Sequence, residues 1–210
     1  MEEDQHQIRH AYLEEYEGAS LVASQAYQCL EVIYPPGLWP SVQKMISDAA
    51  QLKGGGELLI AITHEGISGL VVYHAPSSYK SEHLPQSWAS LTILAVLPQY
   101  RRRGIGSKLI QTCLNIAKTD KTEVFGVLLN VQMTAAKTVF EGKGFVKNGY
   151  SRMISGQKHD QYCLTPYHVV YGIHIDVSAF YVFVSGKLFF RRLIKSLSSS
   201  SMAGARGGCS

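Results

Sequence analysis

Apolar residues recur along the chain with two periods, and the longer period predicts the helices. Several segments place apolar side chains three and four positions apart, with polar residues between them, which is typical of amphipathic helices. Glycine and proline clusters at 34–37 and 54–56 end the first two of these segments. The expected helices span residues 14–31, 39–52, 104–118 and 135–142.

The remaining apolar runs are short and rich in β-branched residues, as strands are. They span residues 7–11, 58–63, 67–73, 89–97, 124–131, 145–154 and 168–175. Glu65-Gly66 favours a hairpin between the second and third runs, and the last two runs are expected to close the sheet as an antiparallel pair. This order predicts an α+β fold with a mixed, mostly antiparallel central sheet flanked by helices.

The densest chemical signal follows the strand at 89–97. Leu-Ala-Val-Leu-Pro-Gln-Tyr leads into Arg101-Arg102-Arg103 and then into Gly104-Ile105-Gly106-Ser107, where a helix begins. Glycines let the backbone approach a ligand closely, and the unpaired N–H groups of a first helical turn bind anions. Arginine side chains add donors suited to phosphate oxygens. The segment therefore predicts a pyrophosphate site.

Two common phosphate loops do not fit these residues. A nucleotide P-loop would require a glycine at Arg101 and a lysine directly after Gly106, but Lys108 comes one position late. A dinucleotide fingerprint would require a third glycine at Leu109.

The pattern Arg-x-x-Gly-x-Gly at Arg101, Gly104 and Gly106 is similar to the acyl-CoA signature of the GNAT superfamily of N-acetyltransferases. A second segment supports this resemblance, since it ends like the family's Tyr-Glu-Lys-x-Gly-Phe. Its matching positions are Ala136, Glu141, Gly144 and Phe145. The resemblance covers roughly residues 7–172 and implies the GNAT fold, acetyl-CoA as the acyl donor and an amine as the acceptor.

In the resembling family, the strands matching 89–97 and 124–131 splay apart, and the pantetheine arm of CoA pairs with the exposed backbone like an added strand. Leu94 and Val96 should then offer backbone bonds to the arm, and the 101–107 loop should hold the pyrophosphate. The resemblance thus implies these acetyl-CoA-binding residues: Leu94, Ala95, Val96, Arg101, Arg102, Arg103, Gly104, Ile105, Gly106, Ser107 and Phe140. No metal site is expected, because the four cysteines are scattered and form no Cys-x-x-Cys pair.

The catalytic residues are not readable from the sequence. Phe140 stands where relatives often carry a tyrosine that protonates the departing thiolate, and Met133 replaces a frequent asparagine. The strand at 89–97 lacks the glutamate that often acts as the base, and the backbone N–H of Val96 is the expected donor to the carbonyl oxygen. The weak catalytic candidates are Tyr34, Thr92 and Tyr100, of which Thr92 could only position a water or an amine, and His74 and His83 are further candidates by their proximity to likely site loops. An amine that arrives neutral needs no dedicated base.

Charge is distributed unevenly. The net charge is +4, but residues 187–210 contain five basic residues and no acidic one, so the first 186 residues sum to −1. A nucleic-acid partner therefore has little support. The acidic N-terminus does not resemble a signal peptide, and the scattered cysteines suit reduced thiols in a cytoplasmic protein. The apolar run after 169 contains His174 and Asp176 and is too short to span a bilayer.

We expect two regions: an acetyltransferase domain over 1–175, and a basic, apolar extension over 176–210 with a disordered Ser/Gly-rich end. The extension fits an added hairpin, an amphipathic segment on a membrane or partner, or an appended sequence without function. The predicted activity is acetyl-CoA-dependent N-acetylation of a small-molecule or peptide amine, by direct attack in a ternary complex. The alternative is a non-catalytic acyl-CoA sensor or interaction domain. The acceptor and the oligomeric state stay open, and a homodimer is compatible with the sequence.

Overall fold

The computed structural model describes residues 6–78 and 83–165. The strand expected over 168–175, the boundary at 175 and the extension over 176–210 lie outside the described residues. Within the described residues, no helix is long and apolar enough to cross a membrane.

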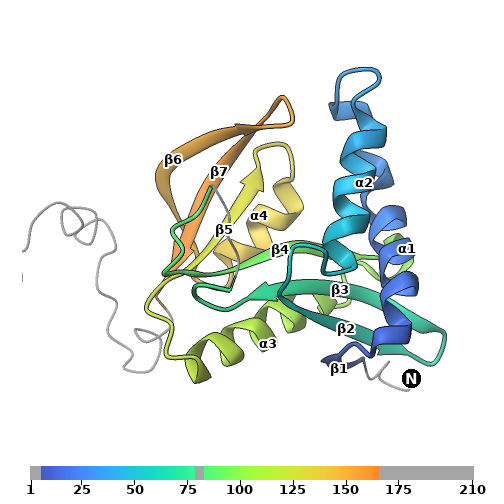
Figure 1. The fold of residues 1–210 in the computed structure, drawn as a ribbon, viewed down its shortest axis with the longest axis horizontal. Coiled ribbons are helices and arrows are strands. Elements are labelled where there is room, and N and C mark those ends of the chain that lie inside the picture. The colour runs from blue at the N-terminus through green and yellow to red at the C-terminus, as the bar shows by residue number, and fades with distance from the viewer. Residues whose placement is uncertain (1–5, 79–82, 166–210) are drawn as a thin grey trace, which may run out of the picture. The chain divides into compact units, whose positions relative to one another are not determined.

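The described residues form one sheet of seven strands, in the order β1-β2-β3-β4-β5-β7-β6 (Figure 1). Every neighbouring pair is antiparallel except β4 and β5, which run parallel. The predicted α+β fold with a mixed, mostly antiparallel sheet is therefore confirmed. The strands are β1 (Gln7–His10), β2 (Glu57–Thr63), β3 (Gly66–His74), β4 (Ala89–Val96), β5 (Phe125–Asn130), β6 (Val146–Ile154) and β7 (Gln157–Leu164).

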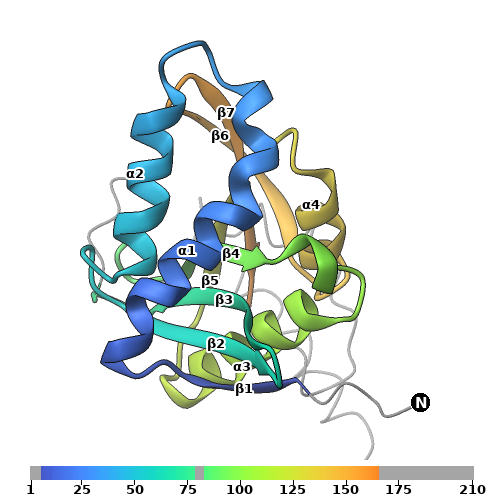
Figure 2. The same cartoon turned by 90° about the vertical axis from the view of Figure 1, so that its right-hand side faces the viewer.

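Helices cover both faces of the sheet (Figure 2). Ala19, Ala23 and Ile46, from the first two helices, pack on one face with Ile60 and Val72. The other face is covered by the amphipathic helix that follows β4, together with the short helix after β5. The helices are α1 (Tyr16–Tyr27), α2 (Trp39–Ala50), α3 (Ile105–Thr119) and α4 (Thr134–Glu141), with 3-10 turns η1 (Leu13–Glu15), η2 (Gln28–Ile33) and η3 (Pro98–Tyr100).

The described part of the chain ends in a hairpin whose second strand the sequence did not predict. Strand β6 pairs with β7, Gln157–Leu164; the expected pairing of residues 145–154 with 168–175 falls partly on residues that the structure does not describe. Ser155 and Gly156 connect the two strands, with φ of 48° and 73°, as a two-residue hairpin turn of type I′ requires. Apolar runs do not reveal this strand, because its first four residues, Gln157-Lys158-His159-Asp160, are polar throughout.

Candidate active site

Strands β4 and β5 diverge soon after they meet. Their parallel pairing is confined to Ala89 with Phe125 and Ser90 with Gly126. Further along β4, a bulge at Ile93 shifts the register against β3, and Ile93 has a φ of 47°, a left-handed conformation that is unusual for a β-branched residue. The bulge re-aims the end of β4, so that a gap in the ladder opens between the two central strands.

The backbone at the end of β4 faces this gap at alternate residues. The N–H of Leu97 donates to the carbonyl of Ser68 on the β3 side (3.0 Å), and Ala95 is paired with Leu70. Because bonding directions alternate along an antiparallel strand, Leu94 and Val96 direct their backbone groups away from β3. Of the three expected β4 residues, Ala95 therefore turns its backbone toward β3, and the other two turn theirs toward the gap.

The carbonyl oxygens of these two residues accept hydrogen bonds from side chains. The hydroxyl of Tyr27, at the end of α1, donates to the carbonyl of Leu94 (3.1 Å), and Nε of Arg101 donates to the carbonyl of Val96 (3.1 Å). Burial raises the pKa of Tyr27 to about 12, so its phenol keeps its proton at neutral pH. Sequence reasoning did not find Tyr27, because its partner lies 67 positions away in the chain.

The loop after β4 has the geometry of an anion site. Gly104 caps α3 in a left-handed conformation, with φ of 80°. The first intrahelical bond runs from the N–H of Lys108 to the carbonyl of Gly104 (2.9 Å). The N–H groups of Ile105, Gly106 and Ser107 therefore precede the first helical bond and have no partner within the helix. Ile105 is buried, so only its backbone is available to a ligand.

The three arginines of the loop are held differently. Arg101 is tied to the protein, because its guanidinium also donates to the carbonyl of Ala26 at the end of α1 (2.6 Å). The guanidinium of Arg103 lies over the ring of Tyr100, 5.5 Å from its centroid. Arg102 is exposed. The sequence grouped all three as phosphate donors, but the contacts of Arg101 suit a brace between α1, β4 and the loop.

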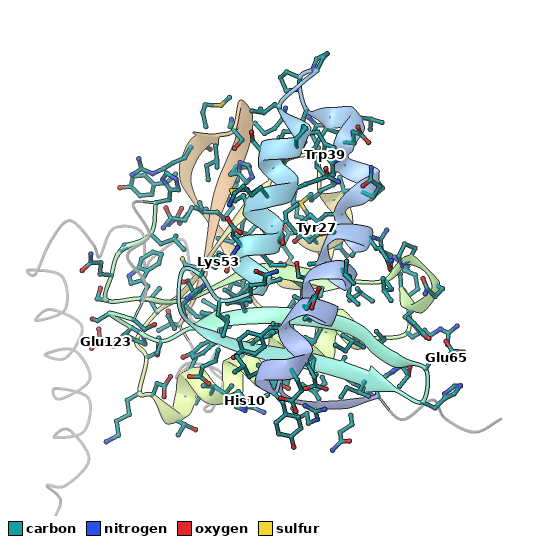
Figure 3. All side chains as sticks on the ribbon, turned by 45° about the vertical axis from the view of Figure 1, so that its right-hand side comes forward. His10, Tyr27, Trp39, Lys53, Glu65 and Glu123 are labelled. Atoms are coloured by element: carbon teal, nitrogen blue, oxygen red, sulfur yellow. The ribbon has the colours of Figure 1, made fainter. Side chains whose placement is uncertain are left out.

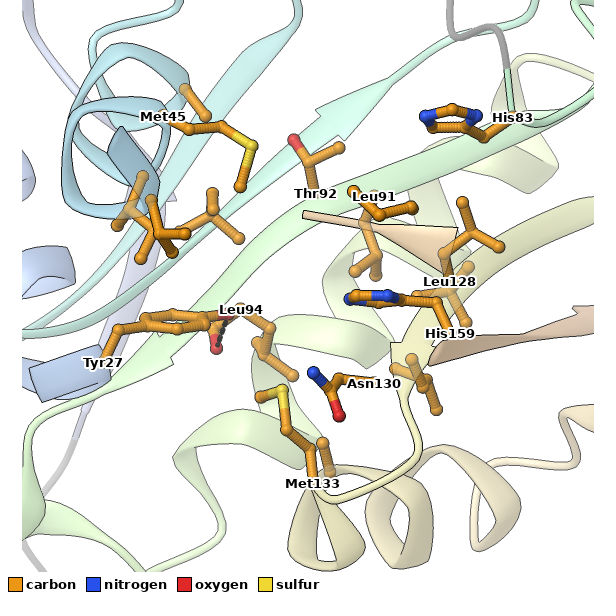
Figure 4. Close-up of a pocket in the computed structure, with 18 of the residues that line it drawn as sticks. Tyr27, Met45, His83, Leu91, Thr92, Leu94, Leu128, Asn130, Met133 and His159 are labelled. Carbon is orange, nitrogen blue, oxygen red and sulfur yellow. Dashed lines mark hydrogen bonds between the residues drawn. The ribbon is translucent and has the colours of Figure 1, made fainter. Parts of the chain in front are cut away.

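A cavity of about 670 Å³ adjoins the gap between β4 and β5 (Figure 4). Residues of α1, α2, β4, β5, the start of α4 and the β6–β7 hairpin line it. Nε2 of Gln157 donates to the carbonyl of Ile33 in η2 (2.6 Å), which ties the β6–β7 hairpin to η2. Of the weak catalytic candidates, Tyr34 and Thr92 line this cavity.

Tyr100 does not belong to the cavity lining. It is buried, and its hydroxyl donates to the carboxylate of Glu65 at the β2–β3 turn. Figure 3 shows Glu65 at that turn, away from Tyr27 and Trp39.

His74 and Thr92 are paired with each other. Nε2 of His74 lies 2.9 Å from Oγ1 of Thr92. Burial lowers the pKa of His74 to about 4, so the ring is neutral at pH 7, and its Nε2 is already engaged with the Thr92 hydroxyl. Burial also raises the pKa of Tyr34, against an opposing effect of the neighbouring Asn130 amide.

Asn130 and His159 are polar residues of the cavity that the sequence did not reveal. They are directly opposite each other on β5 and β7, so both side chains project to the same face of the sheet, and Figure 4 shows them pointing into the cavity. No signal in the sequence pointed to this pair, because it depends on the pairing of a strand that was not expected there.

The hydrogen bonds of this pair fix their orientation. The carbonyl of Gln157 can only accept, so Nδ1 of His159, at 3.0 Å, donates to it and Nε2 keeps its lone pair when the ring is neutral. Burial lowers the pKa of His159, which the Gln157 carbonyl partly opposes. Oδ1 of Asn130 accepts from the N–H of Gln132 (2.9 Å). Nδ2 of Asn130 is buried and has no well-formed hydrogen bond to the described residues.

Phe140 lies at the end of the cavity nearest α4. Its side chain is 1% exposed, and its ring packs edge-on against Phe145 with centroids 5.2 Å apart. Met133, at the start of α4, lines the same end. In the described part of the chain, no group of three or more His, Cys, Asp or Glu residues could hold a metal ion.

The sequence and the fold are both similar to those of known acetyltransferases. Residues 54–147 match the family model of the acetyltransferase (GNAT) domain. The fold is similar to a PaiA N-acetyltransferase from Thermoplasma acidophilum in complex with coenzyme A, with a TM-score of 0.60 at 16% identity over 77% of this chain and 99% of that one. It is also similar to a GNAT family acetyltransferase from Brucella melitensis in complex with acetyl-CoA, with a TM-score of 0.53 at 16% identity over 77% and 88% of the two chains. No curated protein matches the sequence.

Proposed function

We propose that this chain, whose residues 54–147 match the GNAT acetyltransferase domain, is an N-acetyltransferase that moves an acetyl group from acetyl-CoA to a primary amine of a small molecule or peptide. The observation that carries this proposal is the continuity of three features around β4. The strand diverges from β5 after Ser90, its far end leads into the glycine turn of α3, and its middle lines the cavity. An extended donor and an acceptor can therefore meet at one point of the sheet.

We place acetyl-CoA, the acyl donor, along the side of β4 that faces the gap between β4 and β5. The pyrophosphate would accept hydrogen bonds from the N–H groups of Gly104, Ile105, Gly106 and Ser107, with charge from Arg102 and Arg103. The pantetheine arm would run beside Leu94 and Val96, whose N–H groups face the same side as their carbonyls. The thioester would then lie near Phe140.

The reaction requires the amine nitrogen to attack the thioester carbonyl carbon, after which the C–S bond breaks and the nitrogen loses one proton. We assign the acceptance of that proton to Nε2 of His159, which keeps its lone pair because Nδ1 donates to the Gln157 carbonyl. The N–H of Val96 and Nδ2 of Asn130 are the donors that can stabilise the carbonyl oxygen. Phe140 has no proton to give to the thiolate.

The direct test is release of free thiol from acetyl-CoA in the presence of a panel of primary amines, with the acetylated product identified by mass spectrometry. Turnover of at least one amine is expected. Acetyl-CoA binding without turnover of any amine would favour the alternative function, a non-catalytic acyl-CoA sensor, which the apolar Phe140 also allows.

His159→Gln tests the proton acceptor. General base catalysis typically contributes about 10²- to 10⁴-fold, so kcat should fall by at least about 100-fold while acetyl-CoA affinity in calorimetry stays unchanged. The matched control is His64→Gln, because His64 is exposed at the β2–β3 turn and outside the cavity lining. Equal kcat values in the two variants would remove His159 from the mechanism.

A further inference from the structure

We propose that the acceptor is an amine carried on an uncharged, apolar body, such as an arylalkylamine, and not an amino acid or a polyamine. This inference rests on the proposed function, since it names the substrate class of the same cavity. Its basis is the composition of the cavity wall and the state of its charged and polar groups.

The cavity wall is mostly apolar. Trp39 and Ile46 of the α2 side are buried and line the cavity with Leu91 of β4 and Leu128 of β5. Met45 also lines it and is 47% exposed, which places this residue at the mouth. A wall of this kind stabilises a ring or branched alkyl group by removing it from water.

The charged side chains among the described lining residues neutralise each other. Lys44 and Asp48 form an ion pair one helical turn apart on α2, and Asp48 also binds Nζ of Lys53 at 2.5 Å. The lysine bonds hold the pKa of Asp48 below its usual range, so this carboxylate stays ionised and compensated. It is therefore a poor partner for the second ammonium of a polyamine, and Lys44 is a poor partner for an amino-acid carboxylate.

The polar groups deeper in the cavity are neutral. His74 and His159 have lowered pKa values because they are buried. Desolvation by the same wall favours the neutral form of an entering amine, which is the form that attacks a thioester.

Matched amines separate charge from size. We would compare kcat/KM for 2-phenylethylamine, phenylalaninamide, phenylalanine and spermidine. The expected order places 2-phenylethylamine at least about tenfold above spermidine, and phenylalaninamide at least about tenfold above phenylalanine, from which it differs by lacking the carboxylate. A preference for spermidine or for phenylalanine would overturn the inference.

Binding without chemistry keeps the two proposals distinct. Trp39 lines the cavity, so quenching of tryptophan fluorescence reports amine binding even if no thiol is released. Selective binding of 2-phenylethylamine without turnover would contradict the proposed function but support the proposed ligand class. Preferential turnover of phenylalanine or spermidine would support the proposed function but contradict the proposed ligand class.

A charge placed at the mouth tests the location. In Met45→Glu, kcat/KM should fall at least about tenfold for 2-phenylethylamine and rise for spermidine, and the exposure of Met45 makes the variant compatible with folding. Leu21→Glu is the control, because Leu21 is 61% exposed on α1 and outside the cavity lining. An unchanged amine preference in Met45→Glu, with the control also unchanged, would place the acceptor elsewhere.

Discussion

Replacing Arg101 by methionine is expected to destabilise the fold more than it weakens acetyl-CoA binding. Methionine keeps an apolar stem and removes only the guanidinium. Two hydrogen bonds are lost, one to the Ala26 carbonyl at 2.6 Å in a partly buried place and one to the Val96 carbonyl at 3.1 Å near the surface. A buried hydrogen bond from a charged donor contributes about 1.5–3 kcal/mol, and the one near the surface, which water weakens, contributes about 1 kcal/mol, so the free energy of unfolding should fall by about 2.5–4 kcal/mol.

The control is Arg102→Met, at an exposed position of the same loop. Urea unfolding should show a change of less than about 0.5 kcal/mol for this variant, whereas calorimetry should show acetyl-CoA affinity reduced about tenfold by the loss of one charged phosphate contact. Arg101→Met should reduce affinity by less than about threefold. Unchanged stability together with a tenfold loss of affinity in Arg101→Met would refute the assignment of Arg101 as a brace.

Three further predictions concern single residues. Gly106→Val should weaken acetyl-CoA binding more than tenfold in calorimetry while leaving stability within about 1 kcal/mol, because a Cβ there would meet only Val96 at an ordinary 3.8 Å; unchanged affinity would contradict the loop assignment. Phe140→Tyr should leave turnover unchanged or raise it, and a collapse of turnover with folding intact would show that the site depends on the apolar ring. His74 has a pKa of about 4 in the fold against about 6.5 when unfolded, so stability is full above about pH 6.5 and should fall by about 3 kcal/mol as the pH drops toward 4. His74→Gln should lack that loss, and the same pH dependence in both proteins would show that His74 does not cause it.

The fold was largely predictable because its signals are local. The turn from β4 into α3 could be read from Gly104, whose left-handed conformation suits glycine, and from the helical spacing that follows it. The β2–β3 hairpin could be read in the same way, from Gly66. Strand β7 could not be found by apolar periodicity, because Asp160 and Gln161 are buried polar residues that stand where an apolar alternation was sought.

The candidate site was predictable only where it consists of backbone. The N–H groups of the first turn of α3 follow from helix geometry, and the divergence of β4 from β5 was expected only from the resemblance to the GNAT superfamily. The side chains of the cavity depend on long-range contacts. Asn130 and His159 are brought together only by the β5–β7 register, and the Tyr27 hydroxyl, on α1, bonds to the Leu94 carbonyl on β4. The residues of such pairs are far apart in the chain and form no pattern that can be recognised in a single sequence.

The most direct test of the central claim is a crystal structure of the protein with coenzyme A. We predict the pantetheine arm between β4 and β5, bonded to the backbone of Leu94 and Val96, with the pyrophosphate on the N–H groups of residues 104–107. Coenzyme A bound at any other place, with the gap between β4 and β5 left free, would contradict the account.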